Sequence, residues 1–219
     1  MPAPDDYPPH DWLSAPFSPP RSRESGPRNA LGARPFSQDG FGIAMGVEIL
    51  RGNLGDPRVR GSLRRLLNEN VLASFATVDP KGRSHINTAY FAYSEDWSIY
   101  FYSYPSSRHC RNLERRPSMA VAVFDSHQRW GRPDRGVQLF GTAGEAKGPL
   151  AKVAAAVYSR RFPGFEKWHA PVEQDEGAFE LRPFRFRPRR AKLFDEPRLG
   201  AGRFVEVGIP LRRGAVAEA

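Results

Sequence analysis

Three consecutive stretches of aromatic and β-branched residues are separated only by short polar turns, which strongly limits the folds open to this chain. The stretches cover residues 71–78, 84–93 and 97–103, and their composition favours β-strands. The first two are joined at residues 79–82 by Asp-Pro-Lys-Gly, a sequence typical of a tight turn. Strands connected this closely pair side by side in opposite directions. This region therefore predicts an antiparallel meander.

The rest of the chain adds more strands and a few helices. Further strands are expected at residues 118–124, 135–146, 179–186, 189–194 and 203–207. Helices are expected at residues 58–70, 107–116 and 150–162. The total is six to eight strands, mostly antiparallel. Such a set favours a small barrel, because closure removes exposed strand edges.

The first part of the chain differs in composition from the rest. Residues 1–40 hold nine of the 21 prolines, and residues 21–32 mix serine, arginine and glycine without any helical or strand period. We therefore expect residues 1–45 to be a disordered or draped extension. The folded domain is predicted over residues 46–210, and a flexible tail over residues 211–219.

Composition also limits the cellular context and the partners. The single cysteine, Cys110, excludes a disulfide framework within the chain and fits a reducing compartment. Without a signal peptide or a long apolar stretch, a cytoplasmic protein with no membrane partner is predicted. The net charge of +9 favours an anionic partner. Nucleic acid is disfavoured, because the arginines are dispersed and no known nucleic-acid-binding motif accompanies them.

The junction between the third strand and the next helix carries the clearest chemistry. The sequence Tyr-Pro-Ser-Ser at residues 104–107 ends the strand, and the helix then opens with Arg108 and His109. Free backbone N–H groups and the positive end of the dipole make a helix start an anion site. Cations are unfavourable there unless an anion is bound, so a phosphate held by Arg108 and His109 is a natural explanation. A solvated charge for Arg108, and solvation or axial ligation of haem iron for His109, remain open.

This segment resembles the phosphate-binding segment of the split β-barrel proteins that bind flavin mononucleotide (FMN), the pyridoxamine 5'-phosphate oxidase-like family. That segment reads Ser-Arg-Lys-x-x-Asn-Leu, and four residues match it as they stand: Ser107, Arg108, Asn112 and Leu113. His109 stands where the family has lysine. Three further stretches are similar to the family's first hairpin, second strand and a later strand: residues 76–85, 85–91 and 137–146.

The resemblance implies a mainly β fold, a six-stranded antiparallel split β-barrel with flanking helices, assembled as a homodimer. It implies an FMN-dependent oxidoreductase that acts on an unidentified small molecule, with NAD(P)H as a candidate reductant. The cofactor-binding residues that it implies are His85, Asn87, Thr88, Tyr102, Ser103, Ser107, Arg108, His109, Asn112 and Gln138. Gln138 would reach the cofactor across the dimer interface. No residue stands out as a general acid or base, and no metal-ligand spacing is present.

Two departures from the family pattern carry consequences. A histidine at position 109 is titratable, so cofactor affinity is expected to fall as the pH rises through the histidine range. Residues 184–194 lack the Trp-Arg-Leu and Arg-Leu-His signatures of the true oxidases, so oxidation of vitamin B6 is disfavoured.

Three alternatives to an FMN enzyme stay open. A reductase could use the deazaflavin cofactor F420, which is also an anionic phosphate compound, in the same groove. A haem-binding protein on the same barrel could use His109 as the iron ligand, since haem-binding relatives read Ala-His-Ala-Arg-Asn-Leu in this helix. A flavin-binding sensor or storage protein would bind the cofactor without turnover.

Overall fold

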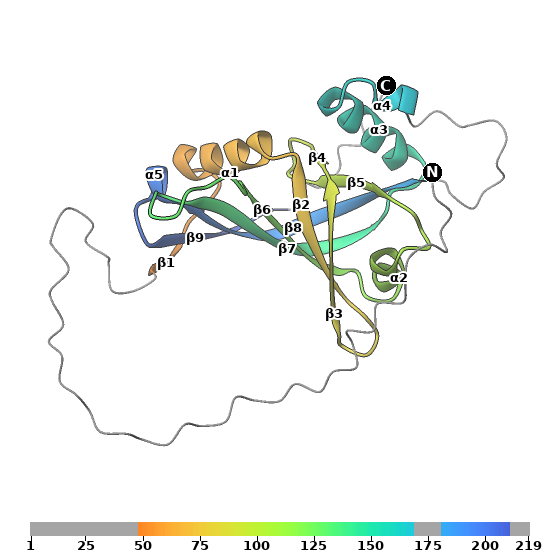
Figure 1. Cartoon of the computed structure of the whole chain (residues 1–219), viewed down its shortest axis with the longest axis horizontal. Coiled ribbons are helices and arrows are strands. Elements are labelled where there is room, and N and C mark those ends of the chain that lie inside the picture. The colour runs from red at the N-terminus through yellow and green to blue at the C-terminus, as the bar shows by residue number, and fades with distance from the viewer. Residues whose placement is uncertain (1–47, 169–180, 211–219) are drawn as a thin grey trace, which may run out of the picture. The chain divides into compact units, whose positions relative to one another are not determined.

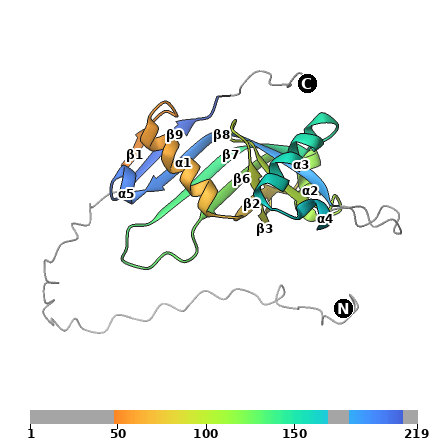
Figure 2. The same cartoon turned by 90° about the horizontal axis from the view of Figure 1, so that it is seen from above.

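The computed structural model describes residues 48–168 and 181–210 (Figures 1 and 2). These residues form a sheet of nine strands: β1 (Glu48–Arg51), β2 (Leu72–Val78), β3 (Ser84–Tyr90), β4 (Ala92–Tyr93), β5 (Ile99–Ser103), β6 (Ser118–Phe124), β7 (Arg135–Glu145), β8 (Arg182–Asp195) and β9 (Arg203–Gly208). The helices in this part of the chain are α1 (Pro57–Glu69), α2 (Arg108–Arg115), α3 (Pro149–Arg161), α4 (Phe165–Trp168) and α5 (Glu196–Leu199). The extension and the tail predicted over residues 1–45 and 211–219 lie outside the described residues.

Strand β8 is central to the sheet, because it pairs with three other strands. Hydrogen bonds join the strands in the order β1-β9-β8-β7-β6-β2-β3. Along one edge, β8 pairs with β7. Along its other edge, residues 182–186 pair with β5 and residues 190–194 pair with β9. Of the described strands, β3 pairs only with β2, and β5 pairs only with β4 and β8. The ladder therefore does not close into a complete ring, and the closed barrel favoured by the strand count is not formed.

The mainly β fold with flanking helices is confirmed, but the expectation of six antiparallel strands is wrong in detail. The sheet has nine strands, and β1 runs parallel to β9. The strands expected at residues 179–186 and 189–194 correspond, from residue 182 onward, to the single strand β8; residues 179 and 180 lie outside the described part of the chain. Pro188 lies in its middle and pairs with Gly141, where the register between β7 and β8 shifts. A bulge at this point tolerates a residue that has no N–H to donate.

Helix α1 covers one side of the sheet (Figure 1). It begins after Asp56, whose side chain accepts a hydrogen bond from the Arg58 backbone N–H at 2.8 Å, and Pro57 occupies its first turn. Its apolar face is buried as predicted and consists of Val59, Leu63, Leu66 and Leu67. None of the described helices is long and apolar enough to span a membrane.

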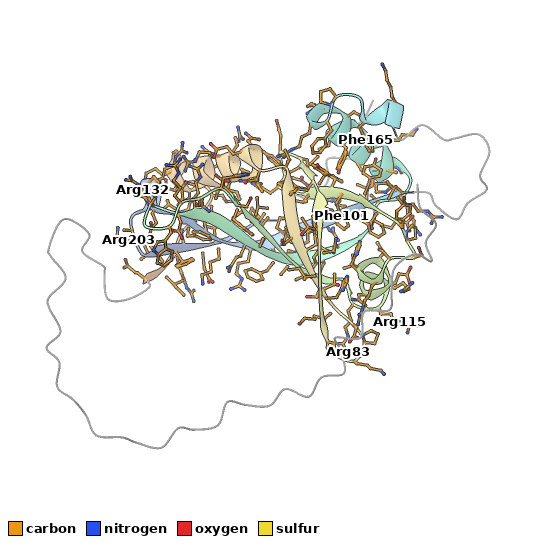
Figure 3. The ribbon with its side chains drawn as sticks, viewed as in Figure 1. Arg83, Phe101, Arg115, Arg132, Phe165 and Arg203 are labelled. Carbon is orange, nitrogen blue, oxygen red and sulfur yellow. The ribbon has the colours of Figure 1, made fainter. Side chains whose placement is uncertain are left out.

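Aromatic side chains from three strands pack together in the interior. Phe101 of β5 is fully buried, and Figure 3 shows it inside the fold. Its ring lies 4.6 Å from that of Phe75 on β2 and 5.5 Å from that of Phe184 on β8, measured between centroids. Phe101 on β5 therefore packs against side chains of both β2 and β8.

The outward side of β6 and β7 is covered by none of the described helices (Figures 1 and 2). Small side chains of β6 and of the neighbouring strand β2 lie on the same side of the sheet: Ser74, Ala76, Ala120 and Ala122. Exposed apolar side chains flank them, with Ile86 66% exposed and Phe124 50% exposed. Gln138 and Lys192 lie on the same face, so this open sheet face combines small and apolar side chains with polar ones.

Helix α3 is attached to α1 through a single arginine. The Arg161 guanidinium donates hydrogen bonds to the carbonyl oxygens of Leu67 and Asn70, which lie at the C-terminal end of α1. The same guanidinium stacks over the Phe91 ring at 4.6 Å from its centroid. Arg161 thus fixes α3 to the end of α1 and satisfies carbonyl groups that the helix leaves free.

Candidate functional site

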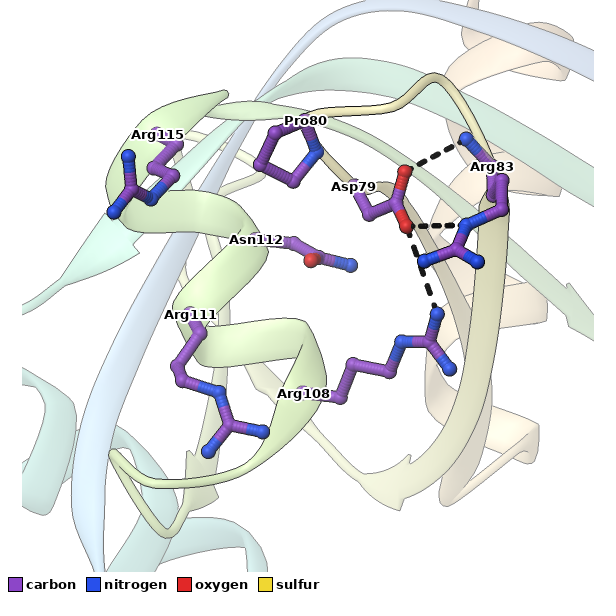
Figure 4. A pocket seen from close by; sticks show the side chains of 7 residues that line it. All are labelled: Asp79, Pro80, Arg83, Arg108, Arg111, Asn112 and Arg115. Atoms are coloured by element: carbon purple, nitrogen blue, oxygen red, sulfur yellow. Dashed lines mark hydrogen bonds and ion pairs between the residues drawn. The ribbon is translucent and has the colours of Figure 1, made fainter.

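A pocket of about 480 Å³ lies between α2 and the turn that joins β2 to β3 (Figure 4). Its lining consists of Asp79, Pro80, Arg83, Arg108, Arg111, Asn112 and Arg115. Four guanidinium groups and one carboxylate give the lining an excess of positive charge. Such a pocket is suited to an anion that can accept several charge-assisted hydrogen bonds.

The Asp79 carboxylate lies on one side of this pocket and binds several of the surrounding N–H groups. Its Oδ1 accepts hydrogen bonds from the backbone N–H groups of Lys81 and Arg83 at 2.9 and 2.8 Å. Its Oδ2 lies 2.8 Å from Arg83 Nε and 3.6 Å from Arg108 Nη2. The hydrogen bond from the Arg83 backbone is the largest influence on the Asp79 pKa, and together with the Arg83 side chain it lowers that pKa to about 2, against the opposing effect of burial. The carboxylate is therefore charged at neutral pH and holds two guanidinium groups near each other.

Helix α2 supplies the other side of the pocket. Ser107 precedes the helix in an extended conformation, but its side chain makes no capping hydrogen bond. The first turn contains no acidic residue, so its positive backbone end faces further positive charge from Arg108. Arg108, Arg111 and Arg115 follow one another at three- and four-residue spacing, which places them on one face of the helix. This face opens into the pocket.

His109 points inward instead of lining the arginine pocket. Its side chain is buried, and its Nε2 lies 2.7 Å from Ser103 Oγ and 3.1 Å from Ser107 Oγ. The His85 ring stacks parallel to the His109 ring at a centroid distance of 6.1 Å. Burial, and secondarily the nearby His85, lower the pKa of His109 to about 4. His109 is therefore a neutral imidazole at neutral pH, and the predicted decrease of cofactor affinity across the ordinary histidine range has no support in this geometry.

We expect the free energy of unfolding to fall as the pH is lowered from about 7 to about 4. The unfolded chain takes up a proton at His109 near its ordinary pKa of 6.5, whereas the folded protein does so near 4, so the unfolded state binds more protons between these values. The loss is on the order of 3 kcal/mol for this group. Denaturant titrations at several pH values measure it.

Two variants test whether His109 is the source of this pH dependence. His109→Gln removes the titrating ring and should flatten the pH slope between 4 and 6.5. His127→Gln changes a histidine whose side chain is 93% exposed and should keep the slope of the unaltered protein. Identical slopes in the unaltered protein and in His109→Gln would contradict the assignment.

Asn112 connects α2 to the sheet as well as lining the pocket. Its Nδ2 donates a hydrogen bond of 3.0 Å to Thr77 Oγ1, and both side chains are buried. The neighbouring thiol of Cys110 is also buried, which raises its pKa and keeps it protonated. Cys110 therefore belongs to the packing of α2 and is not an activated nucleophile.

The other residues predicted for the cofactor are spread over different surfaces. On β3, His85 and Asn87 share the inner face, whereas Thr88 points to the opposite, exposed face. Among the described residues, Asn87 Oδ1 has no hydrogen-bond partner although it is buried. Tyr102 packs with Tyr158 and Phe165 under α3 and α4. Gln138 is exposed on the open sheet face, opposite Ala122 and Lys192.

The structure thus brings together two groups of predicted residues: His85, Ser103, Ser107 and His109 in one cluster, and Arg108 with Asn112 in the pocket. It separates Thr88, Tyr102 and Gln138 from both groups within one chain. Five pocket residues were not predicted as site residues: Asp79, Pro80, Arg83, Arg111 and Arg115.

Comparisons with known proteins place this geometry in context. A family model described as pyridoxamine 5'-phosphate oxidase matches residues 60–194. No curated protein sequence matches the chain.

Solved structures with the same fold include a heme binding protein from Mycobacterium smegmatis, with 16% sequence identity and a TM-score of 0.54 over 67% of this chain and 57% of that one. A protein of unknown function from Agrobacterium tumefaciens has 20% identity and a TM-score of 0.52, over 64% and 58% of the two chains. The heme storage protein HutZ from Vibrio cholerae has 19% identity and a TM-score of 0.50, over 63% and 94%. At these identities the likeness establishes a shared fold.

Proposed function

Because the chain belongs to the pyridoxamine 5'-phosphate oxidase family, whose model it matches over residues 60–194, we propose that it is a flavin-dependent oxidoreductase acting on a small molecule. The observation that carries this proposal is the arginine-lined pocket at the start of α2. The family includes flavin-binding and haem-binding members, and a phosphate-bearing cofactor matches the pocket's charge best. FMN is the flavin that the resemblance implies.

The residues present fit the phosphate of a flavin nucleotide. Arg83 and Arg108 approach the same carboxylate, Asp79, so their guanidinium groups already converge on one anionic group. A phosphate can accept the paired N–H donors of such groups. His85 and Asn87, on the inner face of β3, are the neighbours that we propose for the rest of the cofactor. The unpartnered Asn87 Oδ1 is an acceptor suited to a cofactor N–H or hydroxyl group.

A bound flavin would supply hydride transfer, and the protein would bind, orient and shield it. NAD(P)H is the reductant that we propose. The absence of the Trp-Arg-Leu and Arg-Leu-His signatures from β8 argues against a vitamin B6 substrate, so a different small molecule is proposed. The single cysteine fits a cytoplasmic site of action.

We propose a two-fold dimer that packs through the open sheet face. Ala120 and Ala122 at the middle of this face let two sheets approach closely, and Ile86 and Phe124 provide apolar area around them. Gln138 is exposed on the same face, and we propose that it contacts the cofactor of the partner subunit.

Haem is the second candidate, since two structures with this fold are described as heme-binding or heme-storing proteins. Iron ligation needs a free imidazole nitrogen. His109 Nε2 is instead engaged by the hydroxyl groups of Ser103 and Ser107 inside the fold. This engagement of His109 argues against haem, and we therefore propose a flavin in preference to it. The deazaflavin F420 shares the phosphate chemistry and remains a third candidate.

An absorption spectrum of the purified full-length protein, followed by heat release and chromatography of the chromophore, tests the proposal. We expect flavin absorption bands, release of a flavin nucleotide, bleaching by NAD(P)H, and twice the mass of one chain in light scattering. A Soret band would support haem, and a released deazaflavin would support F420. Flavin binding without any turnover would indicate a passive binder, and failure to bind any flavin would overturn the proposal.

A further inference from the structure

We propose that the pocket on α2 contains two adjacent phosphate subsites, so that it binds a second phosphate group beside the one expected from a flavin mononucleotide. The inference rests on the proposed function for the identity of the first ligand. It concerns Arg111 and Arg115, which the single-phosphate interpretation does not use.

The four pocket arginines form two pairs. In Figure 4, Arg83 and Arg108 converge on Asp79 on one side of Asn112, whereas the side chains of Arg111 and Arg115 extend from α2 in different directions on the other side. The first pair is joined by the Asp79 carboxylate at 2.8 and 3.6 Å. The two pairs therefore differ in their surroundings as well as in their position.

The second pair has no acidic partner in the described part of the chain. Arg111 donates a hydrogen bond to the Ser106 carbonyl oxygen, and neither Arg111 nor Arg115 forms an ion pair with any described carboxylate. Like charges four residues apart on a helix repel each other. Two guanidinium groups that lack an acidic partner and line the same pocket are therefore available to an anion from outside the chain.

The face of α2 that carries Arg108, Arg111 and Arg115 is longer than one phosphate can contact. Arg115 is seven positions after Arg108, which corresponds to about 10 Å along the helix axis at 1.5 Å per residue. A single phosphate can contact groups at one end of such a face. A pocket of about 480 Å³ is large enough for a ligand with two phosphates.

Two sources can supply the second phosphate. It can belong to the same ligand, as the diphosphate of flavin adenine dinucleotide (FAD), or to a separate phosphorylated substrate bound beside FMN. Both have the same chemistry, a phosphate that accepts the N–H donors of Arg111 and Arg115. Binding experiments with defined probes distinguish them.

The experiment compares the unaltered protein with the double variant Arg111→Gln/Arg115→Gln. FMN and FAD affinities are measured by flavin fluorescence, and inorganic phosphate is titrated into the FMN-loaded protein. The double variant Arg60→Gln/Arg64→Gln is the matched control, because it removes two exposed arginines with the same four-residue spacing from α1. Circular dichroism checks that all variants are folded.

If the diphosphate is the ligand, FAD should bind at least about tenfold more tightly than FMN, and only the Arg111/Arg115 variant should lose that difference. If a separate substrate is the source, FMN and FAD should bind equally. Inorganic phosphate should then bind saturably to the FMN-loaded protein, and about tenfold more weakly to that variant. Equal flavin affinities without saturable phosphate binding would overturn the inference while leaving the flavin proposal intact.

A flavin-free measurement separates the two proposals further. Inorganic pyrophosphate should raise the melting temperature of the protein more than inorganic phosphate does, and the Arg111/Arg115 variant should lose this difference. That result, combined with no flavin binding, would support two phosphate subsites and reject the flavin function. No difference between pyrophosphate and phosphate, with no flavin binding, would reject both.

Discussion

Replacing Phe101 with alanine is expected to lower the free energy of unfolding by about 3–5 kcal/mol. The side chain is completely buried and contacts rings on two other strands, at 4.6 Å from Phe75 and 5.5 Å from Phe184. It also lies 6.3 Å from the His109 ring. Removing it leaves a cavity between the two halves of the sheet, which surrounding side chains on paired strands cannot fill without disturbing the ladder.

Chemical denaturation measures this loss as a lower transition midpoint at an unchanged slope. Val153→Ala on α3 is the control, since its side chain is 44% exposed and alanine suits a helix. The control should change stability by less than about 0.5 kcal/mol. A Phe101→Ala protein as stable as the control would show that Phe101 does not hold the two halves together.

Gly141→Ala is expected to destabilise the protein by about 3 kcal/mol or to prevent folding. A Cβ atom at this position would lie 2.0 Å from the Arg187 carbonyl oxygen and 2.8 Å from Pro188 Cα. Both are backbone atoms of β8, so no side-chain rotation relieves the overlap. The strand would have to move away at the point where its register against β7 shifts.

Gly144→Ala is the matched control, because it lies on the same strand and an added Cβ meets nothing within 4 Å. The comparison of the two variants by thermal unfolding and by yield of folded protein isolates the effect of the close approach. Equal melting temperatures would mean that the bulge relaxes freely. The closeness of β7 and β8 at Gly141 would then be unimportant for the fold.

Much of the fold follows from local sequence patterns. Alternation of buried and exposed positions predicted β2 and β6 to within a residue, and the apolar face of α1 was correct. β1 was missed because it has four residues, all exposed, and depends on its parallel pairing with β9. The sequence prediction divided β8 into two strands because a proline normally ends a strand. The strand continues through Pro188 because this residue pairs with Gly141, where the register between β7 and β8 shifts.

The site was predicted only where its residues are close in sequence. Arg108 and Asn112 were found through the strand–turn–helix junction. Asp79 and Arg83 belong to a distant hairpin turn, and their approach to α2 results from the pairing of β2 with β3 and β6, which spacing alone does not reveal. Arg111 and Arg115 show helical spacing in the sequence, but an ordinary solvated helix face shows the same pattern. The inward rotation of His109 depends on the hydroxyl groups of Ser103 and Ser107.

The double pairing of β8 also bears on the order in which this protein can fold during synthesis. Its residues 182–186 complete the edge of β5, which lies about eighty positions earlier in the chain. Until this segment leaves the ribosome, β5 has only the two-residue strand β4 beside it, and Phe101 lacks the ring of Phe184. The aromatic interior is therefore completed late, and the edge of β5 stays open to edge-to-edge association until β8 has been synthesised.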